Sequence, residues 1–494
     1  MDLSNLEHIS SQTENKFSSM VNEQHIAIVP EFTLISGDTL HKVPVAYKTW
    51  GSLNRNKDNV MIICHALSGS ADVADWWGPL IGKGKAFDPT RFFIFCGNTL
   101  GSPYGSASPV TINPDTGSIY GPEFPLTTPQ DDVRLHKIIL DSMGINQVAI
   151  CIGGSMGGMQ VLEWAFLGQE YVKTIAPIAT SSKLSAWCIS WNEAQRQSIY
   201  CDHKYCNGFY RDDEIPDTGL AAARMSALLT YRSRDSFESR FGRKLQDPRK
   251  LSDVNNNNHF KVLTPAETAL LIHNEGHKSE IISNGTNSNN KNEENSKENN
   301  HNNNHNNNHK NCIKNSNNND SIESIDTKEW ALNKNNHLTA AVPHTFSAQS
   351  YLRYQGDKFV KRFDANCYIS LTRKMDSHDI TKGRKGDTVD ILRSIKQPTC
   401  VFGIESDGLF TISEQYELAE HIPNSKMIVI HSPDGHDGFL LEFDQINRHL
   451  LKFIREQLSD IAIREENINV ETTTFQVTKE SLFGEAEVND VMKW

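Results

Sequence analysis

The chain has 494 residues, 37% of them hydrophobic, and a formal net charge of −12 at pH 7. This acidic balance excludes a typical nucleic-acid-binding protein, which would carry a basic face or stripe. No apolar run reaches the roughly 18 residues of a transmembrane helix, so we expect no membrane partner. Because one hydrophobic core seldom grows to this length, we expect a main domain plus an insertion.

The N-terminal segment lacks the features of a targeting sequence. Residues 1–17 contain no apolar stretch and carry acids at Asp2, Glu7 and Glu14. A mitochondrial transit peptide would instead be rich in arginine and poor in acids. We therefore expect a cytoplasmic protein.

The first part of the chain alternates β-rich runs with helical patterns, which is typical of a parallel sheet with crossover helices. Residues 32–34 and 43–50 are expected to form an opening antiparallel pair. Continuous apolar runs indicate central strands that are covered on both faces. These runs are residues 59–65, 92–97, 147–152 and 174–179.

A helical stretch then interrupts the sheet pattern. Residues 185–243 are helical in pattern, and a similar pattern returns at 347–360 and continues to about residue 375. Between them lies an asparagine-rich tract, 283–325, which cannot bury enough apolar surface to offset its ordering entropy. We interpret the stretch as a lid over the carboxyl edge of the sheet, containing a disordered loop.

The sheet pattern resumes with strand-like runs at 399–403 and 427–431, accompanied by helical patterns at 413–421 and 443–457. The chain is thus predicted to contain a core in two parts, a helical insertion between them and an acidic C-terminal extension. The predicted ranges, in that order, are 25–183 with 372–460, 184–371 and 461–494.

The 9 cysteines do not suggest a disulfide framework, because a chain of this size without a secretory signal rarely has one. Four of them fall inside apolar, strand-like runs, where cysteine behaves as a small buried hydrophobe. These four are Cys64, Cys96, Cys151 and Cys400. Cys201, His203 and Cys206 lie close together, but their spacing matches no standard zinc pattern, so no metal site is predicted.

The strongest motif is the hexapeptide GGSMGG, residues 153–158, which contains Ser155. It follows the strand-like run 147–152 and precedes a helical pattern. In that context G-x-S-x-G is the nucleophile elbow of the α/β-hydrolase fold, in which a tight turn strains the serine backbone and leaves no room for neighbouring side chains. The alternative is a glycine-rich turn with an incidental serine.

Candidate partners of Ser155 follow in the expected order of acid and then histidine. Asp407 and His436 each lie just past one of the two late strand-like runs. His436 would accept the serine proton, and Asp407 would orient the imidazole. Glu405 is a weaker alternative because it lies closer to its strand, and turn or capping roles remain open for Asp407 and His436.

An oxyanion hole requires two N–H donors. One is expected from the backbone of Met156, the residue after the nucleophile. The other is expected from the loop after the run 59–65, in the sequence HALSG, where Leu67 is the candidate through its backbone. An ordinary strand-to-helix turn is the alternative for this loop.

The chain resembles the homoserine O-acetyltransferase family over most of its length, excluding roughly the first twenty residues and the asparagine-rich tract. The matching stretches include AYKTWGSLN, CHALSGSADVADWWGPLIG, GNTLGSPYGSASP, GGSMGGMQVLEWA, AAARM, TYRSR, ESDGLF and GHDGFL. The resemblance implies an α/β-hydrolase fold and ping-pong transfer of an acetyl group from acetyl-CoA to the hydroxyl of L-homoserine, a step of methionine biosynthesis. It assigns the catalytic triad to Ser155, Asp407 and His436, with acetyl-CoA as a co-substrate and no metal or redox cofactor.

The resemblance also implies roles for two charged residues. Arg224, in AAARM, would bind the carboxylate of the amino acid, and Asp437 would meet its ammonium group. It further implies a homodimer formed through the lid helices.

Three other functions stay open. A succinyl donor or a serine acceptor would need only a small change in pocket shape, and the sequence does not decide between these variants. An ester or peptide hydrolase could use the same fold, although Arg224 and Asp437 suit a free amino acid better. A non-catalytic binding protein is disfavoured by the intact set of Ser155, Asp407 and His436.

Overall fold

The computed structural model describes residues 6–245, 265–277 and 346–462. The predicted asparagine-rich loop, and nearly all of the predicted C-terminal extension, lie outside the described residues. The chain divides into two compact units, which are Met1–Lys244 with Phe346–Trp494, and Leu245–Thr345. The described part of the smaller unit contains helix α7, Pro265–His273. The predicted domain boundaries stay predictions.

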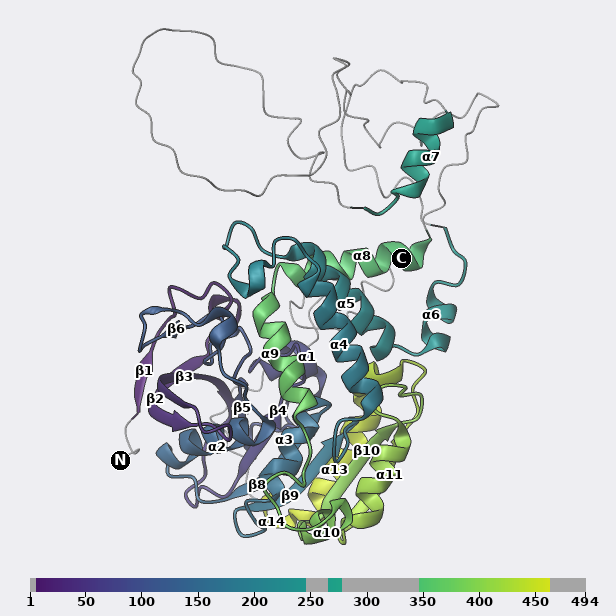
Figure 1. The fold of residues 1–494 in the computed structure, drawn as a ribbon. Helices are drawn as coiled ribbons and strands as arrows, with labels where there is room; N and C mark the ends of the chain where they lie inside the picture. Colours follow the sequence, from purple (N-terminus) through teal and green to yellow (C-terminus); the bar gives the residue numbers. More distant parts are fainter. Residues whose placement is uncertain (1–5, 246–264, 278–345, 463–494) are drawn as a thin grey trace. The chain divides into compact units, whose positions relative to one another are not determined.

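The described part of the larger unit contains a nine-stranded sheet in the order β1-β2-β3-β5-β4-β8-β9-β10-β11 (Figure 1). Strands β1, β2, β3 and β5 pair antiparallel, and the run from β5 to β11 is parallel. The strands are β1 Glu7–Ile9, β2 His25–Thr33, β3 Thr39–Trp50, β4 Val60–Cys64, β5 Phe93–Gly97, β8 Val148–Gly154, β9 Val172–Ile178, β10 Thr399–Ile404 and β11 Ser425–Ile430. A separate two-stranded ribbon pairs β6, Ile112–Asn113, with β7, Ser118–Ile119.

The structure confirms each strand that the apolar runs predict, with ends that differ by one or two residues. The opening antiparallel pair is also present, but both strands begin earlier than predicted, β2 at His25 and β3 at Thr39. Strand β1 was not predicted. Its sequence, EHI, contains a single apolar residue and therefore shows no alternation that could be recognised.

Helices cover both faces of the sheet. One apolar cluster joins the sheet to α2, α3, α10 and α11, and a second joins its other face to α1 and α13. Alternate side chains of β4 point to opposite faces of the sheet, so that Ile62 packs in the first cluster and Met61 in the second. These helices are α1 Val73–Trp77, α2 Pro129–Ser142, α3 Met156–Ala165, α10 Thr388–Ser394, α11 Ile412–His421 and α13 Phe443–Gln457.

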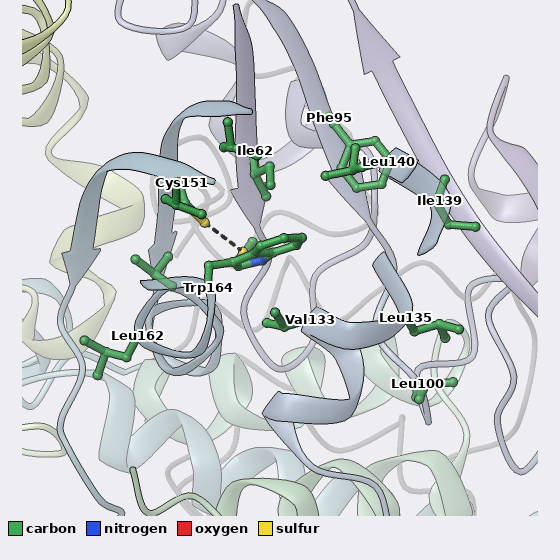
Figure 2. Packing of buried hydrophobic residues seen from close by; sticks show 14 of the residues in the cluster. Ile62, Phe95, Leu100, Val133, Leu135, Ile139, Leu140, Cys151, Leu162 and Trp164 are labelled. Atoms are coloured by element: carbon green, nitrogen blue, oxygen red, sulfur yellow. Dashed lines mark hydrogen bonds between the residues drawn. The ribbon is translucent and has the colours of Figure 1, made fainter. Parts of the chain in front are cut away.

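Figure 2 shows part of the first cluster, in which side chains of the sheet and of the covering helices point toward one another. Trp164 of α3 lies among Ile62 and Cys151 of the sheet and Val133 of α2. The Sγ atom of Cys151 lies 3.8 Å from that of Cys64, and both cysteines are free thiols. The four strand cysteines are all buried, which confirms their predicted place in the core.

A third apolar cluster belongs to the helical stretch between β9 and β10. The helices that contribute to it are α4 Ala186–Tyr200, α5 Asp217–Tyr231, α8 Ser347–Val360 and α9 Ala365–Asp376. The short helix α6, Arg234–Arg240, follows α5 in the same stretch. The cluster includes Leu67 and Met156, which follow the carboxyl ends of β4 and β8. Thus α4, α5, α8 and α9 share a core with the edge of the sheet where ligands bind in open α/β folds. Within the described ranges, no helix is long and apolar enough to cross a membrane.

The smaller unit is an insertion in the larger one, which is interrupted after Lys244 and resumes at Phe346. The N–H of Ser347, at the start of α8, donates to the carbonyl oxygen of Lys244 at 2.9 Å. The chain therefore leaves the larger unit and returns to it at hydrogen-bonded residues. Such an insertion costs little, because the entropy of closing a loop grows only slowly with its length.

A fully buried ion pair connects α9 to α2. Lys374 Nζ lies 2.6 Å from Asp132 Oδ2 and donates to the carbonyl oxygen of Leu100 at 2.7 Å. Asp132 also accepts from the N–H of Leu100 and from the amide of Gln160. Burial disfavours both charges, raising the pKa of Asp132 to about 6 and lowering the pKa of Lys374.

Replacing Lys374 by methionine is expected to destabilise the fold by about 3–5 kcal/mol, because Asp132 loses its cation while staying buried. Denaturant unfolding followed by circular dichroism measures this loss. Lys137→Met is the matched control, since it removes a half-exposed pair with Asp141 on the same helix as Asp132. An exposed pair contributes about 0–1 kcal/mol, so equal losses in the two variants would contradict the structural role of Lys374.

Candidate active site

Ser155 occupies the sharp turn between a strand and a helix. Strand β8 ends at Gly154, and α3 begins at Met156. The backbone of Ser155 has φ 57° and ψ −124°, a conformation that residues with a Cβ rarely adopt. Strain of this kind is characteristic of a nucleophile elbow, which presents the serine hydroxyl above the carboxyl edge of the sheet.

The glycines of the motif are required by close packing. A Cβ atom on Gly157 would lie 2.1 Å from the carbonyl oxygen of Cys64, and one on Gly153 would lie 2.6 Å from the carbonyl oxygen of Gly157. Each of these atoms belongs to the backbone and cannot move aside as a side chain could. The turn that exposes Ser155 therefore depends on glycine at these positions, as the motif predicts.

His436 and Asp407 form a buried hydrogen-bonded pair. His436 Nδ1 lies 2.6 Å from Asp407 Oδ2. The other carboxylate oxygen, Oδ1, accepts from the N–H groups of Leu409 at 2.8 Å and Phe410 at 2.9 Å. Because an ionised carboxylate only accepts, it favours a proton on Nδ1 and leaves Nε2 as the basic nitrogen of the imidazole.

The rival carboxylate, Glu405, is engaged elsewhere. Its Oε2 atom lies 2.7 Å from Nδ1 of His431, and both side chains are largely exposed. The structure thus pairs His436 with Asp407 in preference to Glu405.

Aromatic rings fix the plane of the His436 imidazole. Phe410 stacks on it with ring centroids 5.2 Å apart, and Phe439 meets it edge-on at 5.3 Å. The ring of Tyr231, the last residue of α5, is tilted against the imidazole, with the two ring centroids 6.2 Å apart. The imidazole is therefore held by packing as well as by its bond to Asp407.

Ser155 and His436 line one small cavity. Its other lining residues come from the loop after β4, from α4, α5 and α9, from the loop after β10, and from the short helix α12, Gly438–Leu441, which follows β11. They are Ala66, Leu67, Ser68, Cys188, Trp191, Asn192, Gln195, Thr230, Tyr231, Met375, Leu409, Phe410 and Phe439. The wall is mostly apolar, which restricts the access of water to a reacting group.

Cys188 is a second potential nucleophile in this cavity. Its Sγ donates to the carbonyl oxygen of Leu409 at 3.1 Å. Burial raises the pKa of the Cys188 thiol to about 12, so at neutral pH it is not the reactive thiolate. Ser155 is therefore the stronger candidate.

The two predicted oxyanion donors, Leu67 and Met156, belong to the same buried apolar cluster. Leu67 lines the cavity, and Met156 is the first residue of α3, where helix N–H groups have no partner within the helix. The loop that carries Leu67 is fixed by His65, whose Nδ1 lies 2.8 Å from the carbonyl oxygen of Ala66. His65 Nε2 accepts from the N–H of Thr99 at 3.1 Å. Burial lowers the pKa of His65 to about 4, which keeps it neutral.

Arg224 and Asp437 are both buried close to the cavity, although neither is among the residues that line it. The guanidinium carbon of Arg224 lies 4.9 Å from the ring centroid of Phe359 and 5.8 Å from that of Tyr231. Asp437 lies directly after His436, and its Oδ2 is 2.7 Å from Nε of Arg232. Tyr231 thus contacts both Arg224 and His436.

Relatives with known names match almost the whole chain. A homoserine O-acetyltransferase of Emericella nidulans is 52% identical over 99% of this chain and 98% of its own length. The corresponding proteins of Schizosaccharomyces pombe and Saccharomyces cerevisiae are 50% and 52% identical, over 98% and 97% of this chain and 96% of their own lengths. The chain belongs to the homoserine O-acetyltransferase family. This confirms the resemblance found in the sequence.

The fold of this family member is confirmed by other comparisons. A family model described as alpha/beta hydrolase fold matches residues 59–267. The crystal structure of homoserine O-acetyltransferase from Bacillus anthracis has a TM-score of 0.65 at 19% identity, covering 88% of this chain and 98% of its own. Esterase E22 has a TM-score of 0.63 at 22% identity, with 87% and 99% covered. Since a transferase and an esterase are equally similar, these structures support the fold alone.

Sequence reasoning missed several residues of the site in this homoserine O-acetyltransferase family member. Tyr231 and Arg232 lie in the stretch TYRSR, which contributed to the resemblance but received no role. Phe410 lies in ESDGLF, three residues after the predicted Asp407. Their contacts with His436 and Asp437 connect segments far apart in the chain, so no local spacing could have indicated them.

Proposed function

We propose that this chain transfers an acetyl group from acetyl-CoA to the side-chain hydroxyl of L-homoserine, through an acetyl ester on Ser155. The observation that carries the proposal is the strained elbow of Ser155 in one cavity with the His436–Asp407 pair. The named relatives, at about half identity over nearly the full chain, support the choice of substrates. Methionine biosynthesis is the pathway in which such a product is used.

In the first half of the reaction, Ser155 Oγ attacks the carbonyl carbon of the thioester while His436 Nε2 accepts the hydroxyl proton. The resulting oxyanion lies against the backbone N–H groups of Leu67 and Met156. When the intermediate collapses, the carbon–sulfur bond breaks and His436 returns the proton to the CoA sulfur. The products are acetyl-Ser155 and free CoA thiol.

In the second half, homoserine takes the place of CoA. His436 removes the proton of the homoserine hydroxyl, whose oxygen attacks the acetyl carbonyl carbon. Ser155 leaves with the proton from His436, and O-acetyl-L-homoserine is released. The mostly apolar cavity wall disfavours water as a competing acceptor. No step is assigned to a metal or a redox cofactor, and acetyl-CoA acts as a co-substrate.

The amino acid requires one fixed charge of each sign. We assign the carboxylate to Arg224 and the ammonium group to Asp437, which are both buried near the cavity on different segments of the chain. Arginine suits a carboxylate because its planar fork can donate two parallel hydrogen bonds. The aromatic rings of Phe359 and Tyr231 restrict the orientation of the Arg224 guanidinium.

Arg224→Ala is therefore expected to raise the KM for homoserine by about 10- to 100-fold, the effect of losing one charge-assisted pair of about 1.5–3 kcal/mol. Formation of the acetyl-enzyme from acetyl-CoA should stay close to that of the wild type. Rapid-quench measurement of the first CoA release, together with steady-state kinetics, separates the two effects. A variant that lost acetyl-enzyme formation while keeping its homoserine KM would contradict the carboxylate assignment.

The proposed function is tested by measuring free CoA thiol. Acetyl-CoA and succinyl-CoA are each supplied with L-homoserine, with L-serine or without an acceptor. Sustained release that requires both acetyl-CoA and homoserine is expected. Release that continues without an acceptor would instead indicate a hydrolase. Preference for succinyl-CoA or serine would change the substrates while leaving the chemistry of Ser155 in place.

The cytoplasmic location and the homodimer through the lid helices stay predictions from the sequence.

A further inference from the structure

Two aspartates flank His436 in the turn after β11, and a single arginine contacts both. Arg232 Nη1 lies 3.1 Å from Asp434 Oδ1, and Arg232 Nε lies 2.7 Å from Asp437 Oδ2. The side chains of Arg232 and Asp437 are 2% and 1% exposed, and that of Asp434 is 12% exposed. Charged groups this deeply buried are costly unless they are paired, so the geometry of this bridge is closely constrained.

Residues 231–233, the segment that contains Arg232, also contact the turn of residues 434–437 through their backbone. A Cβ atom on Gly435, the residue before His436, would lie 2.6 Å from the backbone nitrogen of Ser233 and 2.7 Å from the carbonyl oxygen of Tyr231. The hydroxyl of Ser233 donates to the carbonyl oxygen of Pro433. The turn that carries His436 is therefore packed directly on the residues that join α5 to α6.

We propose that Arg232 is a positioning residue, which sets the place of His436 relative to Ser155 and fixes the carboxylate of Asp437 for the substrate ammonium. The proposal rests on the function proposed above, because it assigns Asp437 to the amino acid. Arg232 holds the turn on both sides of the histidine. A shift of this turn moves the catalytic base and the ammonium site together.

The guanidinium group is suited to this role by its shape. Its Nε and Nη1 nitrogens are held in one rigid plane, so that the two aspartates are contacted at a fixed angle to each other. A lysine carries a comparable charge on a single nitrogen at the end of a flexible stem, which can contact two carboxylates but does not fix the angle between them. The proposed bridge between the two aspartates therefore depends on the shape of the guanidinium group and not on positive charge alone.

Arg240 provides a matched control in the same cluster. Its Nη2 lies 2.7 Å from Asp434 Oδ1, which also accepts from Ser236 Oγ at 2.6 Å. Asp434 therefore keeps described partners when either arginine is removed. The Arg240 contact involves Asp434, while Arg232 reaches Asp437 as well. Comparing the two arginines separates a loss of ionic contacts in general from a loss of the bridge.

The experiment compares Arg232→Gln, Arg232→Lys and Arg240→Gln in the full chain. For each variant we would measure the rate of acetyl-enzyme formation from acetyl-CoA, the KM for homoserine and the melting temperature. Arg232→Gln is expected to slow acetylation and to raise the homoserine KM, each by about 10- to 100-fold, as misplacement of a catalytic group by about 1 Å can do. Arg240→Gln should stay within about 3-fold of the wild type in both constants, even if both variants melt at lower temperature.

Arg232→Lys should leave acetylation slow, because a single nitrogen on a flexible stem does not fix the angle between the two aspartates. Full recovery of both constants by lysine would overturn the bridge, and so would equal kinetic effects of Arg232→Gln and Arg240→Gln. A lower melting temperature with unchanged constants would show a purely structural role.

Wild-type thiol release, measured in parallel, separates the two proposals. Its absence contradicts the proposed function, whereas normal wild-type turnover with unchanged Arg232→Gln constants contradicts the role of Arg232 alone.

Discussion

Replacing Ser155 by alanine is expected to lower CoA release from acetyl-CoA by about 10⁴-fold or more, the scale at which removal of a triad nucleophile acts. The substitution deletes the oxygen that attacks the thioester and keeps the Cβ atom, so the strained turn at φ 57° has the same steric demands. The fold and its melting temperature should therefore be unchanged. Circular dichroism and the thiol assay measure the two properties separately.

Two controls make the result for Ser155 specific. Ser190→Ala removes an exposed hydroxyl of α4, which donates to the carbonyl oxygen of Ala186, and should leave turnover unchanged. Cys188→Ser tests the other potential nucleophile of the cavity and should keep most of the activity. If Ser155→Ala retained turnover and Cys188→Ser abolished it, the assignment of the nucleophile would be wrong.

The second large effect is expected for Asp407→Asn, which should lower kcat by about 10³- to 10⁴-fold with little effect on the fold. In the wild type, Oδ1 of Asp407 accepts from two backbone N–H groups and Oδ2 faces His436 Nδ1. An asparagine would keep its oxygen at the N–H groups and place its NH₂ group opposite Nδ1. Because NH₂ only donates, the imidazole proton would move to Nε2, which could then no longer accept the proton of Ser155.

Glu405→Gln is the matched control for Asp407→Asn. Glu405 lies two residues earlier and contacts His431 on the surface, so its loss should change kcat by less than about 2-fold, in keeping with the small worth of exposed ion pairs. The pH dependence of kcat/KM tests the same point, because the asparagine variant lacks the carboxylate that stabilises the imidazolium. Equal losses of activity in Glu405→Gln and Asp407→Asn would contradict the assignment of the acid.

The parts of the fold that could be predicted are those with a local pattern. Continuous apolar runs mark β4, β8 and β10, because buried parallel strands must be apolar on both faces. The elbow at Ser155 could be recognised because its packing requires glycine: a Cβ atom on Gly157 would lie 2.1 Å from the carbonyl oxygen of Cys64. Asp407 and His436 follow strands at the same edge of the sheet, and this placed them near Ser155.

The residues that could not be predicted owe their role to contacts between distant segments. Lys374 pairs with Asp132 across 242 residues of sequence, and Arg232 pairs with Asp434 across 202. No periodicity or motif connects such pairs, because their approach depends on how α5 and α9 pack on the sheet. For Arg224, the resemblance to the family suggested a role, and its contacts with Phe359 and Tyr231 became visible in the structure alone.

The most direct test of the account is to find where the acetyl group resides between the two half-reactions. The enzyme is mixed with acetyl-CoA in the absence of homoserine, quenched in acid, digested and analysed by mass spectrometry. We predict one added acetyl group on the peptide that contains Ser155, and its loss when homoserine is added before the quench. Acetylation of another residue, or turnover without any acetylated enzyme, would contradict a ping-pong transfer through Ser155.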